Sequence, residues 1–244
     1  MKKFFKVIFL FAIVACAYAL VQIITIQQGY QQAAREHAVV RDVAFAHGLE
    51  PVDEDDSARI DFEALHLINE DIVGWIYIPG TNIDHPIVQG ADNDFYLRTT
   101  FTGETNASGS IFMDMRNLSD FSDQQTIIYG HHMRNGTMFT QLTLFQNQDF
   151  FDQHSHIMIY TPEGVKEYEI FSAYLAWAYS DTYQLALAGG EWFEHYLQYI
   201  TGLSMIQTGI SPAPTDQIVT LSTCEYVFED ARMVVHGRLI REND

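Results

Sequence analysis

Cysteine is scarce in this chain of 244 residues, which contains only two. Cys16 lies in an apolar N-terminal run, so Cys224 is the one thiol in the remainder of the sequence. A lone cysteine has no partner for a disulfide within its own domain. Because Cys224 ends a short strand-like segment that begins at Thr220, we expect a reactive thiol there. The alternative is a small, buried core residue.

Basic residues are also few, with 13 Lys and Arg against 32 Asp and Glu and a formal net charge of −19. A protein that binds nucleic acid needs a positive track for the phosphates, so we expect no nucleic-acid partner. Internal repeats and low-complexity tracts are absent as well. The composition is 48% hydrophobic and 14% aromatic, which is enough to bury the core of one domain.

The longest hydrophobic run covers residues 7–26 and is interrupted only by Gln22 and Thr25. Twenty residues in a helix span about 30 Å, the thickness of the hydrocarbon core of a bilayer. Lysines precede this run, so the positive-inside rule places residues 1–6 in the cytoplasm and the rest of the chain outside the cell. The sequence therefore predicts one transmembrane signal-anchor helix and an extracellular domain.

Two other interpretations of the same run remain open. Ala17-Tyr18-Ala19 resembles a signal-peptidase site, and Ile13 to Cys16 resembles a lipoprotein box. Either cleavage would leave the apolar residues from Leu20 to Ile26 at the new N-terminus. We therefore favour an uncleaved anchor.

Residues 27–59 join this anchor to the expected domain. Apolar residues recur at helical spacing between Gly29 and His47, which predicts a juxtamembrane amphipathic helix that ends at Gly48. An acidic run from Asp53 to Asp56 follows, which is typical of a solvated linker. We expect the folded domain to cover residues 60–244.

Alternating apolar residues between glycine and proline turns predict eight strands in this domain. The expected strands are 72–78, 83–88, 110–113, 126–129, 156–161, 165–177, 217–223 and 232–240. One helix is expected at 191–205, with Trp192, Tyr196 and Ile200 on a common face. Eight strands with little helix between them favour a mainly β sandwich or closed barrel.

Histidine is the most suitable partner to activate a thiol, and the chain has ten. His131 is the best placed, because it follows the strand 126–129 at a glycine. The pair His131-His132, with His154 and His156, also suggests a metal site. Adjacent residues in a strand point to opposite faces, however, and no metal-ligand motif is present. We therefore expect no metal and no other cofactor.

Arg232 follows Cys224 by eight residues, a spacing that would return it on the neighbouring strand of a hairpin. Its guanidinium would then lie beside the thiol as a donor to an oxyanion. The alternative is an exposed partner in a surface ion pair.

Together these segments resemble the signatures of sortases, the cysteine transpeptidases of Gram-positive bacterial surfaces. The segments that carry the resemblance are Leu221-Ser222-Thr223-Cys224, Tyr129-Gly130-His131 and Arg232 to His236. Those that resemble class B in particular are Asp71 to Ile76 with Pro79-Gly80-Thr81, Asp92 to Leu97, and Met133 to Phe139. His132 stands where related sequences often carry Asn. The resemblance implies a closed eight-stranded barrel with an N-terminal helix and a helix between strands six and seven.

The resemblance also implies a mechanism. Cys224 would attack the Thr carbonyl of a sorting motif in a secreted protein and form a thioacyl enzyme. His131 would act as general acid and base, and Arg232 would stabilise the oxyanion or orient the motif. The implied acceptor is the amine of a peptidoglycan precursor or cross-bridge, with a pilin lysine as the alternative.

By the family pattern, further residues would contact the sorting motif. They are Asn93, Leu97, Tyr183, Ser222 and Glu225. Two other classes of function stay open: a cysteine hydrolase, in which water resolves the thioacyl enzyme, and a membrane-tethered binding module without a reactive thiol.

Overall fold

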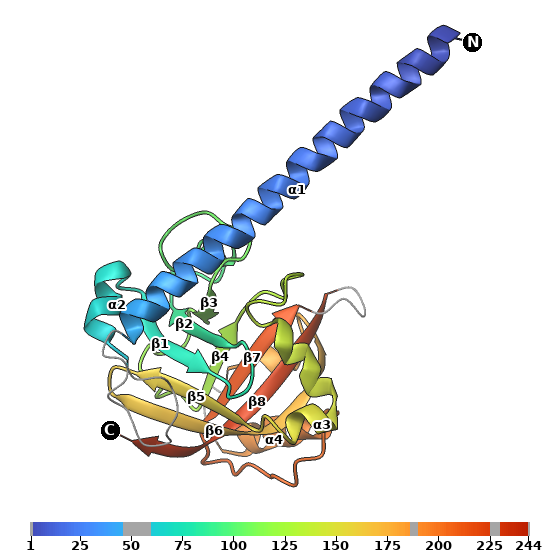
Figure 1. Cartoon of the computed structure of the whole chain (residues 1–244). Coiled ribbons are helices and arrows are strands. Elements are labelled where there is room, and N and C mark those ends of the chain that lie inside the picture. The colour runs from blue at the N-terminus through green and yellow to red at the C-terminus, as the bar shows by residue number, and fades with distance from the viewer. Residues whose placement is uncertain (1, 46–59, 186–189, 225–229, 244) are drawn as a thin grey trace.

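The strands form a closed barrel in the order β1-β2-β3-β4-β7-β8-β6-β5, and β1 pairs with β5 to complete it (Figure 1). The computed structural model describes residues 2–45, 60–185, 190–224 and 230–243. The strands are β1 (Ile72–Tyr77), β2 (Asp84–Val88), β3 (Ile111–Met113), β4 (Gln125–Tyr129), β5 (His156–Thr161), β6 (Gly164–Trp177), β7 (Ile218–Cys224) and β8 (Ala231–Asn243). The closed barrel is thus confirmed.

Helices pack against the outside of this barrel. The α-helices are α1 (Lys2–Ala44), α2 (Phe62–Ile68), α3 (Gln148–Phe151) and α4 (Glu191–Gly202), and the short 3-10 helices are η2 (Phe95–Leu97), η3 (Thr140–Gln146) and η4 (Asp181–Tyr183). The helix expected between the sixth and seventh strands is α4. It ends at Gly202 rather than at Met205, because Met205 donates its backbone N–H to the Ala173 carbonyl of β6 at 2.8 Å.

The expected strand ends differ from the observed ones by single residues, except at the end of β8. This strand continues beyond Ile240 to Asn243, because its last residues pair with the start of β6, where Val165 faces Asn243. The interior is filled by aliphatic and aromatic side chains from every strand, such as Ile76, Ile128 and Leu221. This packing holds the strand ends, and the side chains that follow them, in fixed positions.

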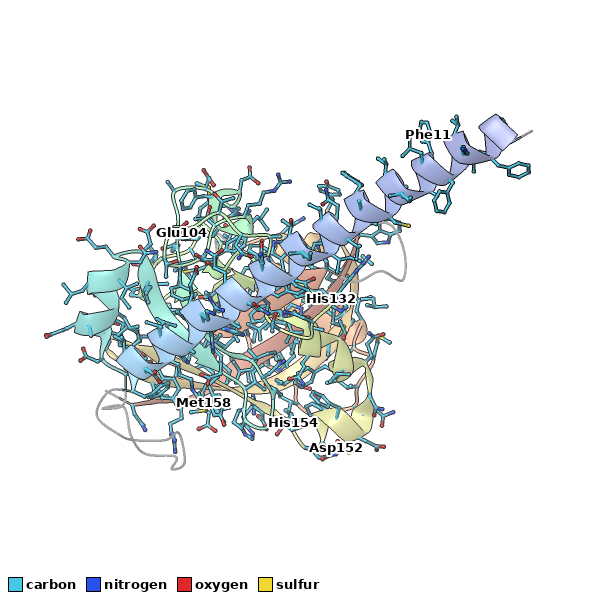
Figure 2. All side chains as sticks on the ribbon, turned by 45° about the horizontal axis from the view of Figure 1, so that its top comes forward. Phe11, Glu104, His132, Asp152, His154 and Met158 are labelled. Atoms are coloured by element: carbon cyan, nitrogen blue, oxygen red, sulfur yellow. The ribbon has the colours of Figure 1, made fainter. Side chains whose placement is uncertain are left out.

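α1 is a single helix, so the expected anchor and the juxtamembrane helix are parts of one element. Its N-terminal part projects away from the barrel, with large exposed apolar side chains such as Phe11 (Figure 2). This helix is long and apolar enough to cross a membrane.

The C-terminal part of α1 packs against the barrel. Val40 and Ala44 are buried in one cluster with Trp75 of β1. Arg41 forms an ion pair with Asp84 at 3.2 Å, and the His37 ring donates to the Asp84 carbonyl at 2.6 Å. The folded unit therefore includes the last turns of α1, on the N-terminal side of the boundary that the sequence places at residue 60.

Two buried histidines make the stability of this fold dependent on pH. Burial, together with the nearby His37, lowers the pKa of His85 to about 3, and burial lowers the pKa of His236 to about 3. Both rings are therefore neutral in the folded protein, whereas they take up protons below about pH 6.5 when it unfolds. Their contribution to stability is complete above pH 6.5. As the pH falls from 6.5 towards 3, the free energy of unfolding decreases by roughly 1.4 kcal/mol per pH unit for each histidine.

We therefore expect His236→Gln to reduce the slope of unfolding free energy against pH below 6.5 by the share of one histidine. Glutamine keeps a group that can hydrogen-bond to Thr220 and Tyr174, the present partners of His236, but does not titrate. Urea unfolding of the full-length protein in detergent measures the slope. The control is His195→Gln, on the exposed face of α4. An unchanged slope in His236→Gln would show that His236 is not held neutral.

Candidate active site

The thiol candidate stands at the C-terminal end of β7, directly opposite Arg232 of β8. Directly opposed residues of an antiparallel pair project from the same face of the sheet. The return of Arg232 on the neighbouring strand, expected from its spacing, is therefore confirmed. Cys224 is partly exposed and has no disulfide partner.

His131 reaches the same rim of the barrel because β4 runs parallel to β7. Tyr129 pairs with Ser222, and the Gly130 N–H donates to the Ser222 carbonyl at 3.1 Å. A side chain at Gly130 would collide with Ile111 and would lie 2.7 Å from Cγ of Phe139. Glycine permits this close packing against Ile111 and Phe139, and the bond from Gly130 to Ser222 places His131 beside the end of β7.

The orientation of the His131 ring is fixed by the backbone of η2. Its Nε2 lies 2.7 Å from the Leu97 carbonyl oxygen, which can only accept a hydrogen bond. Nε2 therefore carries a proton and donates it to this bond. The other ring nitrogen, Nδ1, takes no part in this bond.

These side chains line one cleft of about 310 Å³. Its lining residues are Asn93, Leu97, Phe112, Tyr129, Gly130, His131, Ala178, Tyr179, Tyr183, Ser222, Thr223, Cys224 and Arg232. The structure thus brings together all the site residues proposed from the sequence except Glu225, which lies outside the described residues.

Tyr183 of η4 closes one side of the cleft. Its hydroxyl and the Ser222 hydroxyl form a hydrogen bond of 2.8 Å. Burial, with a smaller effect of the nearby Cys224, raises the pKa of Tyr183 to about 12, although Ser222 and Arg232 oppose the shift. The phenol therefore stays neutral in the physiological range and acts as a hydrogen-bonding group.

Asn93 lies on another wall, in the loop before η2. Its side-chain oxygen accepts the backbone N–H of Met115 at 2.8 Å. The amide NH₂ is then the group that Asn93 can offer to a ligand, and it would suit a carbonyl of an extended peptide.

The chemistry of the cleft is that of a thiol, an imidazole and a guanidinium. Across the parts of the chain that the structure describes, no group of three or more His, Cys, Asp and Glu side chains is placed to hold a metal ion. A thiol beside an imidazole and a cationic donor is suited to acyl transfer.

A family model described as the sortase domain matches residues 76–240, more than half of the chain. The chain belongs to the sortase family. The family predicted from the three motifs is thereby confirmed, and sortases are cysteine transpeptidases.

Sequence relatives and solved structures identify class B. Sortase B of Listeria monocytogenes is 38% identical over 186 residues, which cover 75% of this chain and 75% of that protein. Sortase B of Staphylococcus aureus is 35% identical over 185 residues, covering 75% and 76%. The crystal structure of sortase B from B. anthracis covers 88% of this chain and 100% of its own, with 34% identity and a TM-score of 0.77.

Sequence reasoning proposed Tyr183 but missed the other aromatic residues of this sortase cleft, above all Tyr129. Its ring stacks on Tyr183 with centroids 6.2 Å apart, and its hydroxyl donates to Asp114 at 3.0 Å. The sequence signal that could have identified Tyr129 as a cleft residue was its position directly before Gly130-His131. Tyr179, which is 89% exposed, had no signal, because it follows β6 in an irregular segment.

The sequence suggested that His132 is only a neighbour of His131, but the structure gives His132 a contact of its own with β7. Its Nδ1 donates to the backbone carbonyl of Cys224 at 3.0 Å. The two adjacent histidines therefore contact different elements: His132 bonds to the end of β7, and His131 bonds to Leu97 of η2. His132 is not among the residues that line the cleft.

Proposed function

We propose that this class B sortase cleaves a C-terminal sorting motif of secreted proteins after its Thr and transfers them to an amine of a peptidoglycan precursor or cross-bridge. The observation that carries the proposal is the convergence of Cys224, His131 and Arg232 in one cleft. One solved structure similar to this chain, of the S. aureus enzyme, is described as a sortase B–substrate complex, with 35% identity and a TM-score of 0.70.

The proposed reaction has two acyl transfers. The Cys224 thiol gives its proton to Nδ1 of His131, Sγ attacks the Thr carbonyl carbon, and a tetrahedral oxyanion forms. The C–N bond then breaks, and the leaving amine takes a proton from Nδ1 of His131, which leaves a thioester on Cys224. In the second half, an incoming amine attacks the thioester and gives a proton back to His131. The Cys224 thiolate leaves, and a new amide remains.

Arg232 is the proposed stabiliser of the oxyanion. Its Nη1 donates to the backbone carbonyl of the adjacent residue, Ala231, at 3.0 Å, and this hydrogen bond restrains the guanidinium. The other N–H groups of the guanidinium can donate hydrogen bonds to an oxyanion that develops beside Cys224.

We expect Arg232→Lys to lower kcat by about 10- to 100-fold, because an ammonium keeps the charge but not the rigid fork of donors. The loss should fall on kcat, since the oxyanion develops only towards the transition state. Steady-state kinetics with a sorting-motif peptide measures the split. Arg134→Lys, an exposed arginine outside the cleft, is the control. A loss confined to KM would assign Arg232 to motif binding, and normal activity in Arg232→Ala would remove it from the site.

The proposed location is the cell membrane. The apolar N-terminal part of α1 crosses the bilayer, residues 1–6 stay in the cytoplasm, and the barrel lies on the extracellular side. Substrates that are secreted across the same membrane would meet the cleft there.

A hydrolase would use the same thiol and imidazole, but water would resolve the thioester. The test is incubation of the full-length protein in detergent with a panel of sorting-motif peptides and candidate amines, followed by mass spectrometry. A new amide between peptide and amine supports the proposal. Cleaved peptide without amide, at every amine tested, supports the hydrolase, and exclusive use of a lysine side chain supports pilin assembly.

A further inference from the structure

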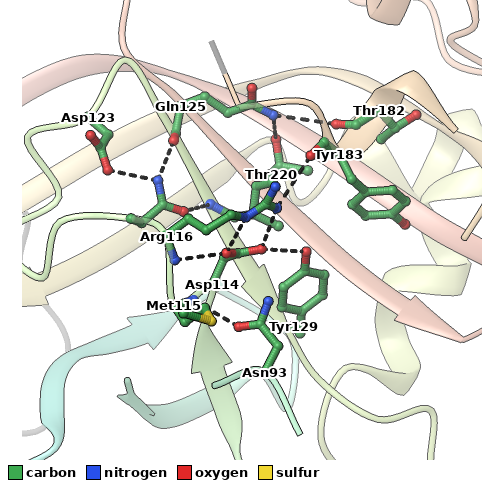
Figure 3. A network of polar contacts seen from close by, with 12 residues as sticks. Asn93, Asp114, Met115, Arg116, Asp123, Gln125, Tyr129, Thr182, Tyr183 and Thr220 are labelled. Carbon is green, nitrogen blue, oxygen red and sulfur yellow. Dashed lines mark hydrogen bonds and ion pairs between the residues drawn. The ribbon is translucent and has the colours of Figure 1, made fainter. Parts of the chain in front are cut away.

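The turn that follows β3 lies next to the cleft and is organised by one buried carboxylate. Asp114 is fully buried, and both of its oxygens accept from Arg116: Nε at 2.8 Å and Nη2 at 2.7 Å. The Arg116 backbone N–H donates to the same carboxylate at 3.0 Å, and the Tyr129 hydroxyl donates at 3.0 Å (Figure 3). This carboxylate is therefore saturated with donors.

The charge of Asp114 is maintained in spite of its burial. Burial alone would raise the pKa of this carboxyl group, but the hydrogen bonds from Arg116 and Tyr129 outweigh it and hold the pKa below its ordinary value. Buried ions depend on such partners, because an unpaired charge in the interior is costly. The pair is thus a fixed ionic unit at working pH.

Three walls of the cleft are joined to this one turn. Asp114 holds the Tyr129 hydroxyl of β4, and Arg116 Nη2 reaches the Tyr183 carbonyl of η4 at 3.4 Å. The Met115 backbone N–H holds the side-chain oxygen of Asn93. Figure 3 shows Asn93, Tyr129 and Tyr183 arranged around Asp114 and Arg116. These wall residues come from segments that are far apart in the sequence.

The reacting groups are held by other contacts. His131 bonds to the Leu97 carbonyl, the Cys224 carbonyl accepts from His132, and Arg232 bonds to Ala231. Neither Asp114 nor Arg116 lines the cleft. The turn therefore acts on the wall that would contact a peptide and not on the groups that would do the chemistry.

We propose that Asp114 and Arg116 are positioning residues for the peptide that donates the acyl group: together they set the places of Asn93, Tyr129 and Tyr183 and so determine which sorting motif the cleft binds. This inference rests on the proposed function. Neither residue contacts the peptide. Their effect on it passes through the wall residues that they hold.

The test compares two arginines that both form an ion pair with a carboxylate. Arg116→Met removes the side-chain bonds to Asp114 and Tyr183 but keeps the backbone N–H bond to Asp114. Arg238→Met removes an ion pair with Glu169 at 3.1 Å, which lies further along β8 and away from Arg232. For full-length proteins in detergent, kcat and KM are measured with a sorting-motif peptide and with an amine. The rate of Cys224 alkylation by iodoacetamide is followed in parallel by mass spectrometry of the Cys224 peptide.

For Arg116→Met we expect the peptide KM to rise about 10- to 100-fold, since small displacements of positioning groups have effects of this size. The amine KM and the pH profile of Cys224 alkylation should stay as in the wild type. Arg238→Met should leave all of these values unchanged. Arg116→Lys should recover only part of the peptide KM, because lysine cannot bind both carboxylate oxygens and the Tyr183 carbonyl.

Unfolding is the simplest artefact, since Arg116→Met leaves Asp114 with fewer partners. The double variant Asp114→Asn with Arg116→Met carries no buried charge and should show the same rise in peptide KM. An unchanged peptide KM in that folded double variant, or a change in alkylation as large as the change in KM, would overturn the proposal. A wild type that turns over no peptide would refute the proposed function itself, and the inference with it.

Discussion

Cys224→Ala is expected to abolish both cleavage and transfer while the barrel stays folded. The only other thiol, Cys16, lies on the exposed apolar part of α1, so no second nucleophile can replace Cys224. Loss of a nucleophile typically removes on the order of 10³-fold or more of the rate. Peptide turnover followed by mass spectrometry measures this loss.

The fold of this variant has to be verified independently. Cys224 is partly exposed at the end of a strand, so its replacement by alanine creates no large cavity. Circular dichroism and thermal unfolding should match the wild type. Cys16→Ala is the matched control and should keep full activity. Turnover in purified, folded Cys224→Ala would refute the cysteine mechanism.

Local patterns were sufficient to predict the strands and the position of Arg232. Pro79-Gly80 and Pro162-Glu163-Gly164 mark chain reversals, and alternation within β5 places Ile157 and Ile159 inside. Such signals depend on a few neighbouring residues, which a sequence displays directly. The hairpin between β7 and β8 is of the same kind, because its two strands are close in the sequence.

The sequence singled out His131 by its position after a strand and a glycine, but it did not show the contacts that place the ring, because these join distant segments. The parallel pairing of β4 with β7 joins Tyr129 to Ser222. The orientation of the His131 ring depends on the Leu97 carbonyl, and a backbone contact of this kind leaves no pattern in the sequence. Leu97, proposed from the family pattern as a substrate contact, thus also orients the histidine through its backbone.

The turn at Asp114 was missed for a similar reason. An aspartate after a strand is a common polar turn residue, and the surrounding sequence gives no sign that Tyr129 and Tyr183 contact this turn. The continuity of α1 was also not predicted. Gly29 lowers helix propensity locally, but Asn106 donates to the Gly29 carbonyl at 3.0 Å and joins this point of the helix to the barrel.

The adjacent histidines give the sharpest test of the site geometry. We expect His131→Ala to lower kcat/KM by about 10²- to 10⁴-fold, the usual contribution of a general acid and base. His132→Ala should lose only about fivefold. It removes one hydrogen bond to the Cys224 carbonyl, which is worth about 1 kcal/mol. Steady-state kinetics on both folded variants measures the ranking.

His132→Asn separates positioning from proton transfer. The asparagine NH₂ group occupies nearly the same place as Nδ1 of histidine and can donate to the Cys224 carbonyl, but it cannot exchange a proton near neutral pH. This variant should therefore recover wild-type activity, while His131→Asn should stay as inactive as His131→Ala. If His132→Asn were inactive and His131→Asn active, the acid and base role would belong to His132. Equal and severe losses in both positions, together with a wild type that is inactivated by chelation and restored by zinc, would instead support a metal site.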